Sequence, residues 1–229
     1  MSALAAVLFD LDGTLFDHPL SARRALDAWL ADRGVPPSEE LAAAWTAAEE
    51  RHFAAWREGR VSFAEQRRGR LRDLLPLLGE PVGDDEALDA VFAGYLAAYE
   101  RAWVGYDDVD AALADVHGLG LATAVLTNGM EDQQRAKLAA LGLLERVGPV
   151  FTAERLGVTK PRPEAFLRVC AALGLPPGQV LYVGDEHEVD VLGARAAGLR
   201  AVHLDRLGAG PADEAARVEG LGELVRHLS

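Results

Sequence analysis

Short apolar runs mark buried strands at the start of the chain and again in its second half. An apolar run that ends at a glycine or a polar residue has the pattern of a strand inside a sheet. The runs cover residues 7–9, 121–126, 180–183 and 200–204. Helices are predicted at about residues 131–141, 163–173 and 188–197, with a last one near Leu224. This alternation predicts an α/β fold with a doubly wound parallel sheet.

Between the first strand and the second, apolar positions recur at helical spacing instead. Leu26, Trp29 and Leu30 mark one helix face, and Ser62 with Glu65 has the spacing of a capping box. We expect the tryptophans and tyrosines of this region to pack in a helical core rather than to stack on a substrate. The predicted organisation is an α/β core of residues 1–17 and 103–229 with an inserted helical cap of residues 18–102.

The composition limits the possible partners. The chain has 229 residues, of which 50% are hydrophobic, enough for a large core. Its net charge of −13 argues against a nucleic-acid partner, because duplex binding depends on basic side chains. No apolar stretch approaches the roughly 20 residues of a membrane span, and the N-terminus lacks a signal-peptide pattern. We therefore expect no membrane association and a cytoplasmic protein, with the single Cys170 as a buried, unreactive thiol.

Lysine is rare in this chain, which has 21 arginines and only Lys137 and Lys160. Lys137 falls on a predicted helix, and we expect it at the surface. Lys160 precedes Pro161 just before another predicted helix. Since arginine is used nearly everywhere else, lysine at this position favours a role in a site. Its ammonium is a compact charge that could neutralise a phosphoryl group and a carboxylate together.

Two carboxylates follow the first strand in the segment Asp10-Leu11-Asp12-Gly13-Thr14. Residues two apart on an extended strand share a side, so Asp10 and Asp12 are expected together at its carboxyl end. Open α/β sheets bind ligands at this edge. Asp10 could attack a phosphorus atom and form an acyl-phosphate. Asp12 could protonate the leaving oxygen and then activate the water that hydrolyses this intermediate.

Two further segments follow later strands. Thr127 and Asn128 come after the second strand and ahead of a helix, where a hydroxyl and free backbone N–H groups can bind phosphate oxygens. Asp185 follows the third strand, with Asp190 five residues later. Several carboxylates gathered at one sheet edge would repel each other without a cation. Mg²⁺ is the expected cofactor, because it prefers oxygen ligands.

These four segments resemble, in order and spacing, the four motifs of the haloacid dehalogenase-like (HAD) hydrolases, and the resemblance covers the whole chain. It implies that Thr127 binds phosphate and that Lys160 serves as the catalytic lysine of the third motif. It also implies that Asp10 and Asp185 provide side-chain ligands to Mg²⁺, with Asp12 providing its backbone carbonyl.

In the same pattern, Asp190 orients a metal-bound water or Lys160. The sequence departs from the family by placing Glu186 and Val189 where small polar residues are usual. This departure leaves open how the surroundings of the metal are arranged.

Several activities occur in such a family, and we expect Mg²⁺-dependent hydrolysis of a small phosphorylated metabolite, a phosphomonoester. A 2-haloacid dehalogenase would need neither an acid at Asp12 nor a metal at Asp185. A phosphonoacetaldehyde hydrolase would need a lysine in the cap, and residues 18–102 contain none. A sugar phosphomutase remains an alternative, since transfer and hydrolysis differ in how water is excluded. A non-catalytic binding protein would be expected to lack one of the motif residues.

The remaining candidates concern specificity. His18, Arg23 and Arg24 stand where the chain enters the cap, and the arginines could hold an anionic group of the substrate. We expect His187, beside the fourth motif, to face solvent. The sequence identifies neither the substrate nor the oligomeric state, which could be a monomer or a homodimer.

Overall fold

The protein, described over residues 3–228 by a computed structural model, consists of two compact units. One unit runs from the start of the chain to His18 and resumes at Val104, and the other is Pro19–Trp103. Both boundaries lie one residue beyond the positions expected from the sequence. The segment from Pro19 to Trp103 is helical, and the remainder carries the sheet.

The α/β unit is built on a six-stranded parallel sheet in the order β3-β2-β1-β4-β5-β6. Its strands are β1 (Ala6–Phe9), β2 (Ala122–Thr127), β3 (Val150–Thr152), β4 (Val180–Gly184), β5 (Arg200–Leu204) and β6 (Arg217–Val218). The direction of strand progression reverses between β1 and β4, which are hydrogen-bonded neighbours. The predicted doubly wound parallel fold is therefore confirmed, with β1 at its centre.

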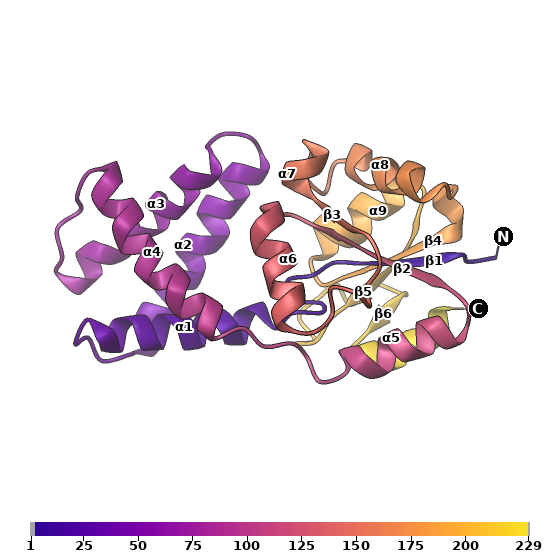
Figure 1. Cartoon of the computed structure of the whole chain (residues 1–229), viewed down its shortest axis with the longest axis horizontal. Helices are drawn as coiled ribbons and strands as arrows, with labels where there is room; N and C mark the ends of the chain where they lie inside the picture. The colour runs from indigo at the N-terminus through magenta and orange to yellow at the C-terminus, as the bar shows by residue number, and fades with distance from the viewer. Residues whose placement is uncertain (1–2, 229) are drawn as a thin grey trace. The chain divides into compact units, whose positions relative to one another are not determined.

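Helices cover both faces of this sheet (Figure 1). They are α5 (Val109–Gly118), α6 (Glu131–Ala140), α7 (Ala153–Leu156), α8 (Pro163–Leu173) and α9 (Gly193–Ala196). On the face of α8 and α9, the core joins Leu8 of β1, Tyr182 of β4 and Phe166 of α8. Cys170 lies in the same cluster with 2% of its surface exposed, as predicted, and burial raises the pKa of its thiol.

Some elements differ from the sequence prediction. Strands β3 and β6 were not expected, because runs of three and two residues are too short to show a pattern. The predicted helix at residues 188–197 begins as a π-helical turn, His187–Leu192, before the short α9. The last predicted helix is a 3₁₀ helix, Leu221–His227, and another short 3₁₀ segment, Pro177–Gln179, precedes β4.

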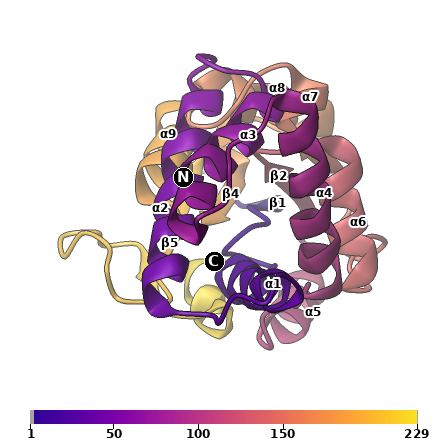
Figure 2. The same cartoon turned by 90° about the vertical axis from the view of Figure 1, so that its left-hand side faces the viewer.

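The helical unit contains α1 (His18–Asp32, from Pro19 onward), α2 (Glu39–Arg57), α3 (Phe63–Leu74) and α4 (Asp85–Arg101), with a 3₁₀ turn at Leu75–Leu78. Helix α3 packs against both α2 and α4 (Figure 2). The hydroxyl of Ser62 accepts a hydrogen bond from the Glu65 amide at 3.1 Å, which confirms the predicted helix cap. Within residues 3–228, no helix has the length and apolar character needed to cross a membrane.

Aromatic side chains form the centre of the helical unit. Trp29, Trp45, Tyr95 and Tyr99 are each at most 5% exposed, so the prediction of a packed aromatic core is confirmed. The indole N–H of Trp45 donates to the hydroxyl of Tyr95 at 3.1 Å. The Arg70 guanidinium lies 4.2 Å from the centre of the Trp45 ring, a cation–π contact that places a charge inside this core.

Candidate active site

The predicted catalytic segments meet at the carboxyl edge of the sheet. Asp10 directly follows β1, Asp185 directly follows β4, and Thr127 is the last residue of β2. Because β1 lies between β2 and β4, the three strand ends are adjacent. The crevice where strand order reverses is the usual ligand site of a doubly wound sheet. Here it lies between β1 and β4, between the positions of Asp10 and Asp185.

Lys160 connects two of the carboxylates at this edge. Its ammonium lies 2.5 Å from Oδ1 of Asp10 and 2.7 Å from Oδ1 of Asp190, and all three side chains are at most 7% exposed. Burial alone would lower the pKa of Lys160, but the charges of Asp10 and Asp190 outweigh it and raise the pKa above its usual value. Lys160 is therefore a fixed positive charge beside Asp10.

Tyr182 completes the surroundings of this lysine, and it was not anticipated from the sequence. Its hydroxyl accepts a hydrogen bond from the Lys160 ammonium at 2.7 Å and lies 3.1 Å from the Leu126 carbonyl oxygen. The three donors of the ammonium are thus directed to Asp10, Asp190 and Tyr182. Tyr182 lies inside an apolar strand, where nothing in the sequence distinguishes it from a core aromatic residue.

The surroundings of Asp10 and Asp185 disfavour a negative charge on either carboxyl group. Burial raises the pKa of Asp10 well above its usual value, and Lys160 compensates only in part. Burial, followed by the charges of Asp190 and Glu186, raises the pKa of Asp185 to about 7. Among the described residues, no cationic side chain forms an ion pair with Asp185, whereas Asp10 has Lys160. The edge of the sheet therefore carries more negative charge than its own cations balance.

Carboxylate oxygens of Asp10, Asp185 and Asp190 can approach within 4.8 Å of one another, close enough to share one ion. Asp190 already uses both oxygens, Oδ1 toward Lys160 and Oδ2 as acceptor from the Glu186 amide at 3.1 Å. Asp10 and Asp185 are thus the better ligands. Oxygen donors with excess negative charge fit Mg²⁺. Asp190 has two expected roles, to orient a metal-bound water or to orient Lys160. The structure contains the contact with Lys160.

Glycine is required beside this cluster at Gly13. Its φ is +85°, and a Cβ atom there would lie 2.1 Å from Oδ2 of Asp185. Any side chain at position 13 would therefore displace the Asp185 carboxylate, in addition to straining the backbone. The glycine of the first motif makes room for the aspartate of the fourth.

Asp12 lies in a different environment from Asp10. Its Oδ1 is 2.5 Å from the Lys137 ammonium, and its Oδ2 accepts a hydrogen bond from Nε2 of Gln134 at 2.8 Å. Burial acts to raise the pKa of Asp12, but the charge of Lys137, then that of His18, together with these hydrogen bonds, lowers it below its usual value. Asp12 is stabilised as a carboxylate.

The expectation that Lys137 lies at the surface was wrong. The residue is 3% exposed and reaches inward from α6 to Asp12. Its helix has an exposed and a buried side, and the sequence alone did not show which side carries Lys137. The rarity of lysine in the chain was the signal that could have identified it.

Thr127 and Asn128 are placed differently from one another. Thr127 is 1% exposed, and its hydroxyl accepts a hydrogen bond from Gln134 at 2.6 Å. The side chain of Asn128 binds the backbone of Lys160 twice, donating to its carbonyl at 3.0 Å and accepting from its amide at 2.9 Å. The Asn128 amide therefore fixes the lysine segment. The backbone N–H and the second N–H of its side-chain amide remain for the predicted contact with phosphate.

His187 does not face solvent freely, contrary to our expectation. Its side chain is 16% exposed, and Nε2 lies 3.1 Å from Oε2 of Glu214. A second histidine, His203, is 3% exposed and has its Nε2 3.0 Å from the carbonyl oxygen of Asp185. His203 was not anticipated, because it lies within a strand pattern without a recognisable motif.

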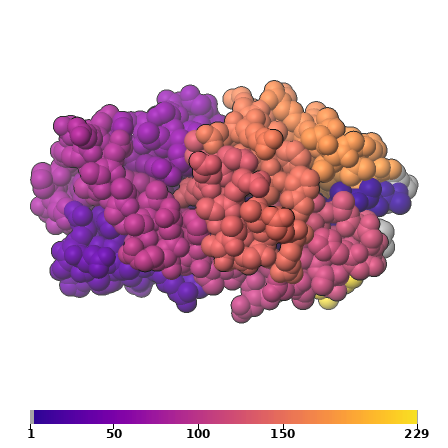
Figure 3. Space-filling model, viewed as in Figure 1, coloured from indigo at the N-terminus to yellow at the C-terminus, as the bar shows by residue number. Residues whose placement is uncertain are grey.

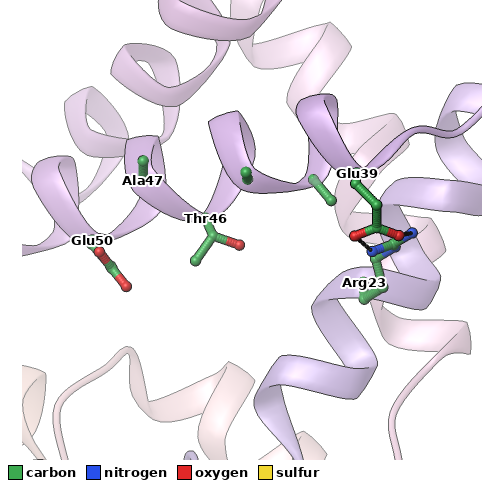
Figure 4. A pocket seen from close by; sticks show the side chains of 7 residues that line it. Arg23, Glu39, Thr46, Ala47 and Glu50 are labelled. Carbon is green, nitrogen blue, oxygen red and sulfur yellow. Dashed lines mark hydrogen bonds and ion pairs between the residues drawn. The ribbon is translucent and has the colours of Figure 1, made fainter.

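The candidates for specificity fall in both units. His18 belongs to the α/β unit, where its charge acts on Asp12. Arg23 binds Asp27 and Glu39 through its guanidinium, and Arg24 is exposed. Arg23 and Glu39 close one end of a pocket on the helical unit (Figure 4). One face of α2 supplies the rest of its lining: Ala42, Ala43, Thr46, Ala47 and Glu50.

Comparison with known proteins identifies the family. The family model for haloacid dehalogenase-like hydrolases matches residues 4–198 of this chain. The chain belongs to the haloacid dehalogenase-like hydrolases. This confirms the resemblance inferred from the four motifs, and it makes the protein an enzyme of a hydrolase family.

Relatives with similar sequences are named phosphatases. A phosphoserine phosphatase of Thermus thermophilus is 43% identical over 101 residues, which cover 44% of this chain and 41% of that protein. A ribulose-1,5-bisphosphate 5-phosphatase of Halopiger xanaduensis is 33% identical and spans 87% of this chain and 84% of its own length. The prediction of a HAD-like phosphatase agrees with these names, which differ in substrate.

Solved structures share the fold over nearly the whole chain. The HAD hydrolase YfnB from Bacillus subtilis, solved with magnesium, has a TM-score of 0.86 with 23% identity and 99% coverage of both chains. An L-2-haloacid dehalogenase from Xanthobacter autotrophicus has a TM-score of 0.74 with 28% identity and 97% coverage of both. The fold is thus common to hydrolases with different reactions, so the residues of the site must discriminate between them.

Proposed function

We propose that this enzyme hydrolyses a small phosphomonoester in a Mg²⁺-dependent reaction that passes through an aspartyl-phosphate on Asp10. The observation that carries the proposal is the contrast between two carboxylates two residues apart. Asp10 contacts Lys160 and faces Asp185, whereas Asp12 is held separately by Lys137 and Gln134. A nucleophile and an acid–base group with separate environments are what a two-step phosphoryl transfer requires.

In the first step, an oxygen of Asp10 attacks the phosphorus, and the bond from phosphorus to the ester oxygen breaks. Asp12 gives a proton to this leaving oxygen. In the second step, water attacks the phosphorus, the Asp10–phosphorus bond breaks, and Asp12 takes the proton of the water. Asp12 thus enters the first step as the carboxylic acid, leaves it as the carboxylate and regains a proton from the water in the second step. The two hydrogen bonds that Asp12 accepts in the structure stabilise the carboxylate form that the second step requires.

Lys160 and Thr127 are assigned to the transferring group. Since the Lys160 ammonium is held by Asp190 and Tyr182, it needs little reorganisation to balance charge on the phosphoryl oxygens near Asp10. Mg²⁺ would be held by the carboxylates of Asp10 and Asp185 and the Asp12 backbone carbonyl, and it would supply the positive charge that these residues lack. Thr127, at the end of β2, would bind a phosphoryl oxygen.

A dehalogenase is the principal competing reaction, since dehalogenases share the fold. Halide expulsion needs no proton donor, yet both carboxylate oxygens of Asp12 are held by donors, Lys137 and Gln134. A phosphomutase would use the same residues and is distinguished only by its products. A cytoplasmic location, a small phosphorylated metabolite as partner, and a monomeric or homodimeric state remain predictions.

The decisive experiment measures phosphate release from p-nitrophenyl phosphate and from a panel of sugar, nucleotide and glycolytic phosphates. We expect turnover with Mg²⁺, none in excess chelator, and suppression by Ca²⁺, whose larger coordination sphere would take both oxygens of Asp10. Beryllofluoride should form an adduct on Asp10. Full activity in chelator would remove the metal from the proposal. Release of halide from 2-chloropropionate without any phosphatase activity would replace it with the dehalogenase.

A further inference from the structure

Helix α6 presents two polar side chains toward the interior, although the helix itself lies at the surface of the α/β unit (Figure 3). Gln134 is 2% exposed and Lys137 is 3% exposed. They are three residues apart and therefore share one helix face. By contrast, Asp132 and Ala136, which lie on other sides of α6, are exposed. A buried amide and a buried ammonium on a surface helix require a partner inside.

That partner is Asp12. The Lys137 ammonium lies 2.5 Å from Oδ1, and the Gln134 amide nitrogen lies 2.8 Å from Oδ2. Each carboxylate oxygen therefore has its own donor, and both donors come from the same helix. Two fixed donors determine the rotation of a carboxylate as well as its position. The arrangement orients Asp12 independently of the cluster formed by Asp10, Lys160 and Asp190.

The position of Gln134 is itself constrained. Its Nε2 also donates to the hydroxyl of Thr127 at 2.6 Å, so one amide links Asp12 to the end of β2. Gly129 provides the space, because a Cβ atom there would lie 2.8 Å from Cδ of Gln134. The Lys137 ammonium also lies 4.6 Å from the centre of the Phe16 ring, a cation–π contact. These contacts fix both donors.

We propose that Lys137 and Gln134 are positioning residues that orient Asp12 for proton transfer during phosphoryl transfer and hydrolysis. This inference rests on the proposed function, since it assigns to Asp12 the acid–base role. Neither residue touches the phosphoryl group in this scheme. Substitution of Lys137 should therefore lower kcat and leave KM nearly unchanged, and its effect should depend on the presence of the Asp12 carboxylate. Substitution of Gln134 should also raise KM, because Gln134 donates to Thr127 as well.

A double-mutant cycle tests this dependence with p-nitrophenyl phosphate and phenyl phosphate as substrates. General acid–base catalysis contributes about 10²- to 10⁴-fold, so Asp12→Asn should lower kcat by roughly that factor and Lys137→Met by about 10-fold or more. In the Asp12→Asn background, Lys137→Met should produce no further loss. KM should stay within about threefold of the wild-type value in Lys137→Met, because uniform binding is unaffected.

Two further variants keep the test informative. Arg135→Met removes a cation from a more exposed position of the same helix and should leave kcat unchanged. If Lys137→Met does not fold, Gln134→Met removes a donor without leaving an unpaired charge. Its loss in kcat should be smaller in the Asp12→Asn background than in the wild-type background, and the part that remains comes from Thr127, to which Gln134 also donates. Losses that multiply with Asp12→Asn, or a Lys137→Met enzyme as fast as wild type, would overturn the inference. A wild-type protein without phosphatase activity would instead overturn the proposed function.

Discussion

The two units of the molecule differ in how far their ion pairs are exposed to solvent. In the helical unit, Arg23 and Glu39 form an ion pair 36% and 87% exposed, and neighbouring arginines and carboxylates are paired in the same manner. In the α/β unit, Lys160 lies between Asp10 and Asp190, with exposures of 3%, 7% and 1%. Apart from the pair of Arg70 and Glu49, 7% and 20% exposed, the helical unit keeps its ion pairs at least partly exposed, whereas the α/β unit buries two carboxylates around Lys160.

This difference indicates where function is located. Exposed ion pairs are screened by water and contribute little to stability, so they can be exchanged with small effects. A buried carboxylate whose pKa is raised by burial and by a neighbouring charge, as that of Asp185 is by Asp190, destabilises the fold and persists only where the protein uses it. The contrast predicts large catalytic effects from substitutions at the sheet edge and small effects from substitutions on the helical unit.

The largest effect is expected for Asp10→Asn. The amide has nearly the same shape but cannot attack phosphorus, so kcat should fall by at least about a thousandfold, as for other covalent nucleophiles. The variant should remain folded, because loss of a buried negative charge relieves repulsion from Asp185. Phosphate release and thermal unfolding would be measured beside Asp115→Asn, an exposed control on α5. Turnover within tenfold of wild type would contradict the role of Asp10.

Lys160→Met should have the next largest effect. Loss of a preorganised charge raises the barrier by roughly 3 to 4 kcal/mol, which is a 10²- to 10³-fold lower kcat for every phosphate ester alike. The variant should also be less stable, by about 3 to 5 kcal/mol, because the carboxylates of Asp10 and Asp190 lose their buried partner. Arg162→Met, an exposed substitution two residues away, is the matched control. A loss confined to some substrates would assign Lys160 to specificity instead.

A smaller and pH-dependent effect is expected for Asp185→Asn in the absence of metal. The folded protein raises the pKa of this carboxyl to about 7, above the value in an unfolded chain, so folding favours the protonated form. Its contribution to stability is present at low pH and is lost as the pH rises through 7. In chelator at pH 8, Asp185→Asn should therefore raise the melting temperature by a few degrees, whereas at pH 5 it should not.

The same shift predicts that protons compete with Mg²⁺ at this site. Affinity for Mg²⁺ should weaken as the pH falls below about 7, because a carboxylate ligand must be deprotonated to bind. Titration calorimetry at several pH values would measure this. Asp213→Asn, on an exposed loop, is the control for both measurements. An affinity independent of pH between 5 and 8 would show that Asp185 is not a ligand.

The sequence predicted the sheet edge well because the information there is local. A carboxylate directly after an apolar strand is placed by the strand itself, so the strand pattern alone locates Asp10 and Asp185 at this edge. The expected limits of the helical segment came from a change of hydrophobic period, which is also local. The fold class followed from the alternation of these elements.

What the sequence did not reveal are contacts between segments far apart in the chain. Lys137 meets Asp12 across 125 residues, and Tyr182 meets Lys160 across 22. Which side of α6 turns inward depends on how the helix packs, and its pattern is too weakly amphipathic to decide this. His203 was missed for a related reason, since its role is a contact with the Asp185 backbone rather than part of a motif.

The smallest effect on stability, and the sharpest test of the comparison, is expected for Arg23→Ala. The guanidinium binds Asp27 and Glu39 on the helical unit, and water surrounds much of this pair, so the melting temperature should change by less than about 2 °C. If Arg23 selects substrates, the relative rates among phosphate esters should shift. Hydrolysis of p-nitrophenyl phosphate should stay nearly constant, since the proposed catalytic residues lie in the other unit. Arg24→Ala removes the adjacent, exposed arginine and is the matched variant. A proportional fall of all rates in Arg23→Ala would mean that this surface acts on catalysis in general, as a lid does, and the division of roles between the two units would not hold.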